Sequence, residues 1–305
     1  RRPNRAMPSR ALARERILLV LLILSWAISW PVIKLGVATV PPIWYACFRY
    51  GIATICLFSL VVVRHEAAFP PPSDWPLVAV SGVLQMAAYS ALTASSLTIL
   101  PPGRASVLAF STPIWVIPLA AYRLRERVSG AAAFGVGLGL LGVLAIATPA
   151  VRAEGSRQTL GYLMLLGAAA SWAVSIVVVR GHRFTATTLA LAPWQMLVAA
   201  CLLAVLAIAV EGAPRRIGLD GAASLAYVGP VATAFAYWAV VEAGRRLRAR
   251  TLSMALLVTP ALGVVISAFT LREPVGASLI AGIFLIATGI HLATRASHPS
   301  SCPAS

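Results

Sequence analysis

The chain has 305 residues, of which 59% are hydrophobic and only 11% are charged, and its formal net charge is +16. A soluble domain usually carries about 25% charged residues, so this composition excludes an ordinary soluble protein. The net charge does not indicate nucleic-acid binding, because the basic residues lie at the ends of apolar runs and no polar segment is long enough to present a basic face. The sequence therefore predicts an integral membrane protein.

Ten apolar runs follow one another along the chain, each of about 20 residues, the length needed to cross a hydrocarbon core about 30 Å thick. The expected spans are residues 17–36, 43–63, 76–97, 103–122, 130–148, 160–179, 187–210, 222–241, 251–271 and 275–293. The first run follows a basic segment, residues 1–16, with Met7 as a candidate start of the chain. This run is longer than the apolar core of a cleavable signal, so we expect it to remain as a helix. The Ser- and Pro-rich tail, residues 295–305, is expected to be disordered.

The two halves of the chain are faint copies of each other. The string SWAIS at residues 25–29 returns as SWAVS at residues 171–175, and SVLAFSTP at residues 106–113 returns as SMALLVTP at residues 253–260. The tripeptide LRE also occurs twice, ending at Glu126 and again at Glu273. These matches, 146 or 147 positions apart, indicate an internal duplication.

The duplication divides the chain into two five-span repeats, residues 17–148 and 160–294, joined by a short polar linker at residues 149–159. Because five is odd, the second repeat must lie upside down in the membrane relative to the first. The predicted fold is therefore an all-α integral membrane protein with ten transmembrane helices in two inverted five-helix repeats. This arrangement is typical of secondary transporters, which bind their substrate near the middle of the membrane at the repeat interface.

The distribution of the basic residues predicts the orientation of the spans. Most of the 25 Lys and Arg residues fall on the side of the N-terminus when the ten spans are drawn across a bilayer. Cytoplasmic loops carry an excess of these residues. We therefore expect both termini in the cytoplasm and a multi-pass protein of a bacterial inner membrane.

Several groups of residues resemble a known family. The string WAISWPVIK at residues 26–34 is similar to the opening helix of the drug/metabolite transporter superfamily, EamA type, and so is the CFRY string around Arg49. The family's pattern of proline, glutamate and two glycines has counterparts in both repeats, which are Pro113, Glu126, Gly135 and Gly142 and then Pro260, Glu273, Gly282 and Gly289. The resemblance covers about residues 17 to 294. It implies ten helices, two inverted repeats and transport of small metabolites, commonly export, with the aromatic amino acid exporters as one branch.

Arg49 is the one basic residue placed clearly inside an expected span. An ionised side chain within a membrane is a functional candidate by default, and Arg49 could attract or bind a substrate carboxylate. The alternative is that it extends to the interface or ties helices together through backbone carbonyls. Lys34 lies closer to the end of its span, where we expect a gate or a tie between helices.

Polar and aromatic residues inside other spans predict a neutral binding cavity. Gln85 and Tyr89 are four residues apart and share one helical face, and Tyr237 and Trp238 lie in the corresponding region of the second repeat. The candidate substrate-binding residues are Trp26, Trp30, Arg49, Gln85, Tyr89, Trp172, Tyr237 and Trp238. Packing between helices is the alternative role for each of them. A cavity lined by these residues would suit a planar apolar side chain.

Two further patterns concern the backbone. Pro113 and Pro260 occupy equivalent places in the two repeats and are candidate hinges, with a fixed kink as the alternative. Residues 137–142 spell GLGLLG, which matches the dinucleotide-binding fingerprint, but that motif requires a preceding strand. Here it lies in an expected membrane helix, where small residues allow helices to approach closely.

The acidic residues are few, and the ten expected spans contain no Asp. Glu126, Glu242 and Glu273 lie at span ends. We find no carboxylate pair, no Cys/His arrangement and no P-loop motif, so the sequence predicts no enzyme activity, no cofactor and no metal. The expected partners are a small-molecule substrate, such as an amino acid or similar metabolite, and the lipid bilayer, with no nucleic acid; a monomer is compatible with the sequence.

The predicted function is export of small metabolites by alternating access, with aromatic and neutral amino acids as the favoured substrates. Because few carboxylates lie within spans, we expect a facilitative or weakly coupled exporter. Efflux of lipophilic cations is the first alternative, since neutral aromatic surfaces attract cations, and Arg49 would oppose it. A scaffold that transports nothing is the second alternative.

Overall fold

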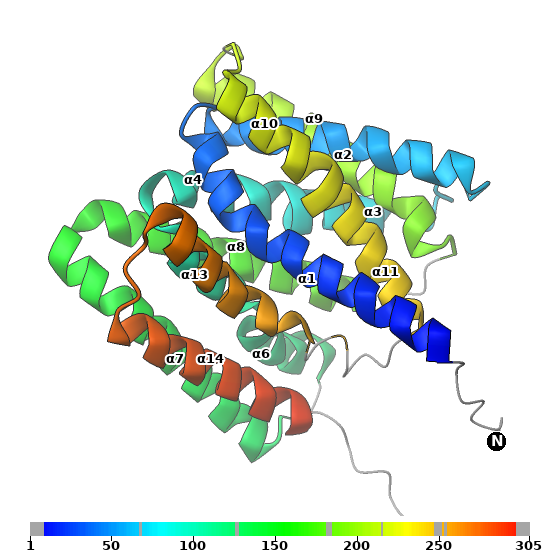
Figure 1. Ribbon diagram of the computed structural model, residues 1–305. Coiled ribbons are helices and arrows are strands. Elements are labelled where there is room, and N and C mark those ends of the chain that lie inside the picture. The colour runs from blue at the N-terminus through cyan, green and yellow to red at the C-terminus, as the bar shows by residue number, and fades with distance from the viewer. Residues whose placement is uncertain are drawn as a thin grey trace, which may run out of the picture.

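The computed structural model describes residues 9–66, 69–125, 128–180, 185–214, 216–246, 252 and 255–296. Within these ranges the regular structure is helical throughout, and no strand is present. Eight helical segments among the described residues are long and apolar enough to cross a membrane, and the shorter apolar helices Val258–Leu271 and Ala277–Ala293 complete the set of ten. The predicted all-helical membrane fold is therefore confirmed (Figure 1).

The first repeat contains α1 (Ser9–Val37), α2 (Pro42–Val63), α3 (Trp75–Val80), η1 (Ser81–Ala88), α4 (Tyr89–Ile99), α5 (Pro102–Ala109), α6 (Thr112–Leu124) and α7 (Gly130–Glu154). The second contains α8 (Ser156–Arg180), α9 (Thr188–Glu211), α10 (Leu219–Tyr227), η2 (Val228–Phe235), α11 (Ala236–Arg246), α13 (Val258–Leu271) and α14 (Ala277–Ala296). The third span is formed by α3, η1 and α4 together, the fourth by α5 and α6, and the eighth by α10, η2 and α11.

The helices extend further into the segment between the repeats than the apolar pattern indicated. Helix α7 continues to Glu154 and α8 begins at Ser156, so most of the expected linker, residues 149–159, is helical. Polar residues end an apolar run without ending a helix, because a helix satisfies its own backbone hydrogen bonds in water as well as in lipid. Gly155, with φ of +80°, supplies the break, since glycine adopts this left-handed conformation without steric cost.

The packing follows a two-fold pattern that relates the repeats. Equivalent helices pair with each other, α2 with α9 and α7 with α14, and the contact of α1 with α13 is matched by the contact of α8 with α6 (Figure 1). The two π-helices, η1 and η2, also lie 147 positions apart, and the left-handed residues Arg125 and Arg272 end equivalent helices. The duplication read from the sequence is therefore also present in the fold.

Glycines bring α7 and α14 into backbone contact, as the small-residue pattern predicted. A Cβ atom added to Gly135 would lie 2.6 Å from the carbonyl oxygen of Gly289, and one added to Gly142 would lie 2.9 Å from that of Gly282. No real Cβ contact is so short, so each site requires glycine. Gly142, the last residue of the GLGLLG string, therefore packs α7 against α14.

Pro113 and Pro260 lie next to interruptions in equivalent spans. The fourth span is broken at Phe110 and Ser111, and Pro113 stands in the first turn of α6, where its missing N–H costs no hydrogen bond. Pro260 lies in the first turn of α13. A change of direction at both places remains a prediction, and so does the hinge role.

Two carboxylates connect the start of a helix in one repeat to the other repeat. Asp74, fully buried before α3, accepts hydrogen bonds from the backbone N–H groups of Thr185 and Ala186 at 2.9–3.1 Å, just before α9. Glu211, at the end of α9, accepts from the N–H groups of Ile43 and Trp44 at 2.9 Å, at the start of α2. An anion at a helix N-terminus satisfies N–H groups that have no partner within the helix.

Replacing Asp74 by alanine is expected to lower the free energy of unfolding by about 1–3 kcal/mol, because it leaves the N–H groups of Thr185 and Ala186 without their acceptor. The Asp74→Asn variant keeps one acceptor oxygen and should lose less. Thermal unfolding of the detergent-solubilised protein, followed by tryptophan fluorescence, measures both. Asp220→Ala, at an exposed carboxylate, is the control and should melt like the unmodified protein; equal melting of all three variants would contradict the capping role.

Candidate functional site

Arg49, in the first half of α2, links the two repeats. Its Nε donates a hydrogen bond of 2.6 Å to Oγ1 of Thr233 in η2, and that hydroxyl donates to the carbonyl oxygen of Val228 at 2.7 Å. The guanidinium carbon lies 5.4 Å from the centre of the Tyr50 ring. Among the described residues no carboxylate pairs with Arg49. Arg49 therefore ties two helices, which was the alternative to a binding role, but it does so through the Thr233 hydroxyl and not through a backbone carbonyl. The tie uses the Nε edge of the guanidinium alone.

Neutral polar side chains extend this contact across four helices. The Ser90 hydroxyl on α4 donates to the Tyr50 hydroxyl on α2 at 3.1 Å. The Tyr237 hydroxyl on α11 donates to Oε1 of Gln195 on α9 at 2.9 Å. Tyr50, Ser90 and Gln195 are buried. Together with Arg49 these residues form a polar layer shared by both repeats.

Aromatic rings border the polar layer. Tyr89 on α4 contacts Trp172 on α8 edge to face, with ring centres 4.9 Å apart, and Tyr89 lies within electrostatic range of Arg49. Gln85 lies in η1, which packs against both α8 and α9. The structure thus gathers Arg49, Gln85, Tyr89, Trp172 and Tyr237 on helices that contact one another at the repeat interface. Their role in binding stays a prediction.

The other three candidates contact the α1 side of the molecule. Trp26 donates from Nε1 to the carbonyl oxygen of Ala232 at 3.1 Å, and its ring lies 6.4 Å from that of Phe110. Trp30 is 5% exposed within the core. Trp238 packs against Phe235, with ring centres 5.8 Å apart. These contacts pack helices together, and a binding role for the three residues stays a prediction.

Sequence reasoning missed Tyr50 and Ser90, which lie beside the predicted residues Arg49 and Tyr89 in the chain. It also missed the π-helices, each of which ends two residues before a member of the polar layer, Ser90 or Tyr237. Single π-helical turns are often found at functional sites. No signal in the sequence marks a π-helix, because its residues are ordinary helix formers. Lys34 is a helix tie, as predicted, since Nζ donates to the carbonyl oxygens of Leu97 at 2.6 Å and Leu100 at 3.2 Å.

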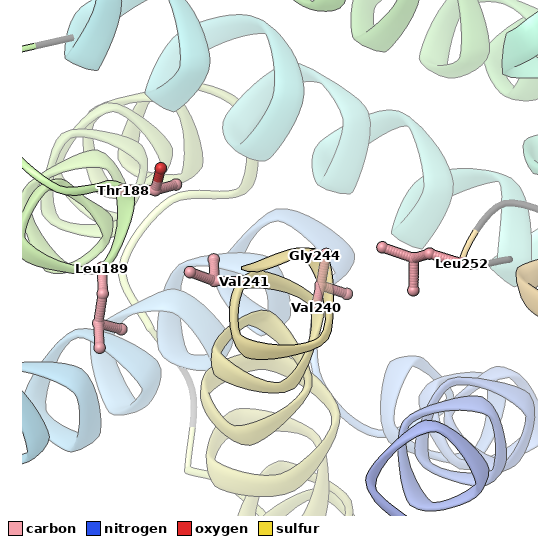
Figure 2. A pocket seen from close by; sticks show the side chains of 6 residues that line it. All are labelled: Thr188, Leu189, Val240, Val241, Gly244 and Leu252. Atoms are coloured by element: carbon pink, nitrogen blue, oxygen red, sulfur yellow. The ribbon is translucent and has the colours of Figure 1, made fainter. Parts of the chain in front are cut away.

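A cavity of about 390 Å³ lies beside α9 and α11, and no residue of the polar layer lines it (Figure 2). Its lining residues are Thr188, Leu189, Val240, Val241, Gly244 and Leu252. In Figure 2, Val241 of α11 lies on the side of Leu189 of α9, and Val240 lies on the side of Leu252. None of the predicted binding residues lines this cavity. In the part of the chain that the structure describes, no group of His, Cys, Asp and Glu is arranged to hold a metal ion.

Ten apolar helices in two repeats, with a polar layer at the repeat interface, define a multi-pass membrane transporter built from repeats. The sequence matches the model of the EamA-like transporter family over residues 14–148 and 159–295, and the chain belongs to that family. The resemblance inferred from the sequence is thereby confirmed.

Curated relatives are similar over nearly their whole length. The chain is 24% identical to the uncharacterized transporter YoaV of Bacillus subtilis, with 89% of this chain and 93% of the relative covered. It is 25% identical to a probable amino-acid metabolite efflux pump of Escherichia coli, with 92% and 94% covered. It is 29% identical to a probable terminal-alkyne amino-acid exporter of Streptantibioticus cattleyicolor, with 88% and 91% covered.

A solved crystal structure shares the fold. It superimposes with a TM-score of 0.63 at 22% identity and covers 92% of this chain and 98% of its own. At this identity the likeness concerns the fold alone.

Proposed function

We propose that the protein exports amino acids, aromatic and neutral ones in particular, by alternating access through a central cavity between the repeats. In this proposal the chain lies in a bacterial inner membrane with both termini in the cytoplasm, and it has no enzymatic activity. The observation that carries the proposal is the guanidinium of Arg49, which stands at the repeat interface without a carboxylate partner among the described residues. A partly buried ion between membrane helices is costly without a counter-ion, and a substrate carboxylate would offset that cost.

The surroundings of Arg49 fit the remainder of an amino acid. The hydroxyl of Tyr50 and the amides of Gln85 and Gln195 are neutral groups able to accept hydrogen bonds from an ammonium group. The rings of Tyr89 and Trp172 offer edges and faces to an aromatic side chain. Two relatives described as an amino-acid metabolite efflux pump and an amino-acid exporter support the same substrate class.

Movement between the two states would occur at the interruptions before Pro113 and Pro260. Both prolines lie in the first turn of a helix, and a turn directly precedes each of these helices. Because α5 and α13 pack against each other, a change at either break would alter the contact between repeats. The two prolines are hinges in this proposal.

Flux into proteoliposomes of the purified protein tests the substrate class. We expect saturable uptake of labelled phenylalanine, and competition by threonine and other neutral amino acids. Phenethylamine, which keeps the ring and amine of phenylalanine but lacks the carboxylate, should not compete. A proton gradient should be imposed in a parallel series, since it reports coupling.

Efflux of lipophilic cations is the second candidate, because the same rings attract cations. Labelled tetraphenylphosphonium in the same vesicles distinguishes the two. Saturable flux of this cation, with no flux of amino acids, would overturn the amino acid proposal. Absence of flux for every compound would leave the family assignment intact and reject the proposed substrates.

A further inference from the structure

Glu273 is a buried carboxyl group placed between the two repeats. It follows the end of α13 and is 8% exposed. Its Oε2 accepts a hydrogen bond of 2.7 Å from the N–H of Gly103, and its Oε1 accepts one of 3.3 Å from the N–H of Arg104. Glu273 belongs to the second repeat, and it therefore joins that repeat to the start of α5 in the first repeat.

The chain turns sharply between α4 and α5, at residues 97–104, and we call this segment the α4–α5 corner. It is held from two sides by hydrogen bonds. Lys34 on α1 donates to carbonyl oxygens at the end of α4, while the carboxyl oxygens of Glu273 accept from N–H groups at the start of α5. A donor therefore lies at the carbonyl end of α4, and an acceptor lies at the N–H end of α5. The corner can therefore leave α13 only if the carboxyl group of Glu273 gives up its contacts.

The groups at the α4–α5 corner are closely packed. A Cβ atom on Gly103 would lie 2.8 Å from Oε2 of Glu273, so the carboxyl group rests directly on the backbone. One turn further, Ser106 is fully buried, and its hydroxyl lies 3.4 Å from the carbonyl oxygen of Pro260 on α13. A Cβ atom on Gly263 would lie 3.1 Å from the same hydroxyl. Helix α5 therefore contacts α13 near its start, at Pro260 and Gly263, and contacts Glu273 beyond its end.

We propose that Glu273 is a proton-binding site, and that uptake of a proton by this carboxyl group accompanies closure of α5 against α13. The proton comes from water at this end of the molecule and binds Oε1, which has the longer contact, while Oε2 keeps its hydrogen bond from Gly103. When the two helices separate, the carboxyl group of Glu273 becomes exposed to water and releases the proton. The proposal rests on the transporter class and does not depend on the substrate.

Burial and the groups around Glu273 shift the pKa of its carboxyl group in opposite directions. Burial raises the pKa of the Glu273 carboxyl group above its usual range, and this effect outweighs the N–H bonds from Gly103 and Arg104 and the positive charges of Arg104 and Lys34. Arg157 on α8 faces Lys34, Tyr162 on α8 accepts from Arg104 at 3.5 Å, and Arg272 is adjacent in the chain. Because the pKa is higher in the closed arrangement than in water, acidification favours closure and deprotonation favours opening.

Labelling of a cysteine at position 106 tests the proposal without any substrate. The Ser106→Cys variant is made in a chain whose four cysteines, Cys47, Cys56, Cys201 and Cys302, are replaced by alanine. A water-soluble maleimide reports opening between α5 and α13. Each rate is divided by the rate for Ser156→Cys, an exposed position, so that the ionisation of the thiol itself cancels.

With Glu273 present, we expect the normalised rate to fall as the pH is lowered from about 7.5 towards 5, by at most about tenfold per pH unit, the limit for one proton. Glu273→Gln, which resembles the protonated carboxyl group, should label slowly at every pH. Asp220→Asn, at an exposed carboxylate, is the matched control and should keep the original pH profile.

A Glu273→Gln variant that retains the original pH profile, or that labels rapidly at every pH, would overturn the proposal. Gly103→Ala provides an independent variant if Glu273→Gln does not fold. The added methyl group displaces the carboxyl group, so labelling should be rapid and independent of pH, and an unchanged profile would also overturn the proposal. Failure of phenylalanine flux affects only the proposed substrate, because these measurements involve none.

Discussion

Replacing Arg49 by alanine is expected to lower phenylalanine flux at subsaturating concentration by about 30- to 1,000-fold, equivalent to about 2–4 kcal/mol for a lost charge-assisted contact. The reason is that Arg49 is the one cation of the polar layer and has no carboxylate partner among the described residues. Arg49→Lys keeps the charge but loses the planar fork that binds a carboxylate through two hydrogen bonds, so it should recover only part of the flux.

The competing role of Arg49, a tie between α2 and η2, requires its own variant. Thr233→Val removes the hydroxyl that accepts from Nε and leaves the guanidinium in place. If Arg49 binds substrate, Thr233→Val should reduce flux far less than Arg49→Ala does. Equal losses in the two variants, accompanied by equal falls in melting temperature, would assign Arg49 to helix packing and contradict a binding role.

Replacing Gly289 by valine is expected to give the largest loss of stability, about 3 kcal/mol, at the upper end of the range for overpacked sites. A Cβ atom at this position would lie 2.5 Å from the carbonyl oxygen of Gly135 and 2.7 Å from the backbone nitrogen of Gly139. Both neighbours are backbone atoms, so no side chain can move aside. Helices α7 and α14 would have to separate along their whole contact.

The matched control is Gly137→Val, in the same pair of helices. Gly137 is exposed, and no atom lies within 4 Å of a Cβ added there. Thermal unfolding in detergent and the yield of monodisperse protein should fall for Gly289→Val and stay nearly constant for Gly137→Val. Similar melting temperatures for the two variants would mean that α7 and α14 are not in backbone contact.

Much of the architecture could be predicted from the sequence. Apolar runs of the length of a bilayer mark the spans because a membrane imposes one length on every crossing helix. The matches between SVLAFSTP and SMALLVTP and between the two LRE strings identify the repeats. The glycines of the GLGLLG segment were recognisable as a place for helix packing, because small residues allow two helices to approach closely.

The assignment of faces was beyond the sequence. Lipid-facing and buried sides of a membrane helix are equally apolar, so the pattern cannot tell which side of α1 or α11 faces the interior. For this reason Trp26, Trp30 and Trp238 were grouped with Tyr89 and Trp172, although the structure places them in different contacts. The end of α7 and the start of α8 were also missed, because hydropathy marks the part of a helix that is apolar enough for the membrane and does not mark where the helix ends.

The sequence by itself thus determined the class of protein, the set of spans and the duplication, because composition, run length and internal similarity are properties of the chain alone. Only the tertiary structure decided which groups meet. Arg49 forms a hydrogen bond with Thr233, 184 residues away in the chain, and Glu273 forms one with Gly103, 170 residues away. Such contacts depend on how two inverted repeats pack against each other, and a polar residue at a span end gives no sign of the distant backbone that it will bind.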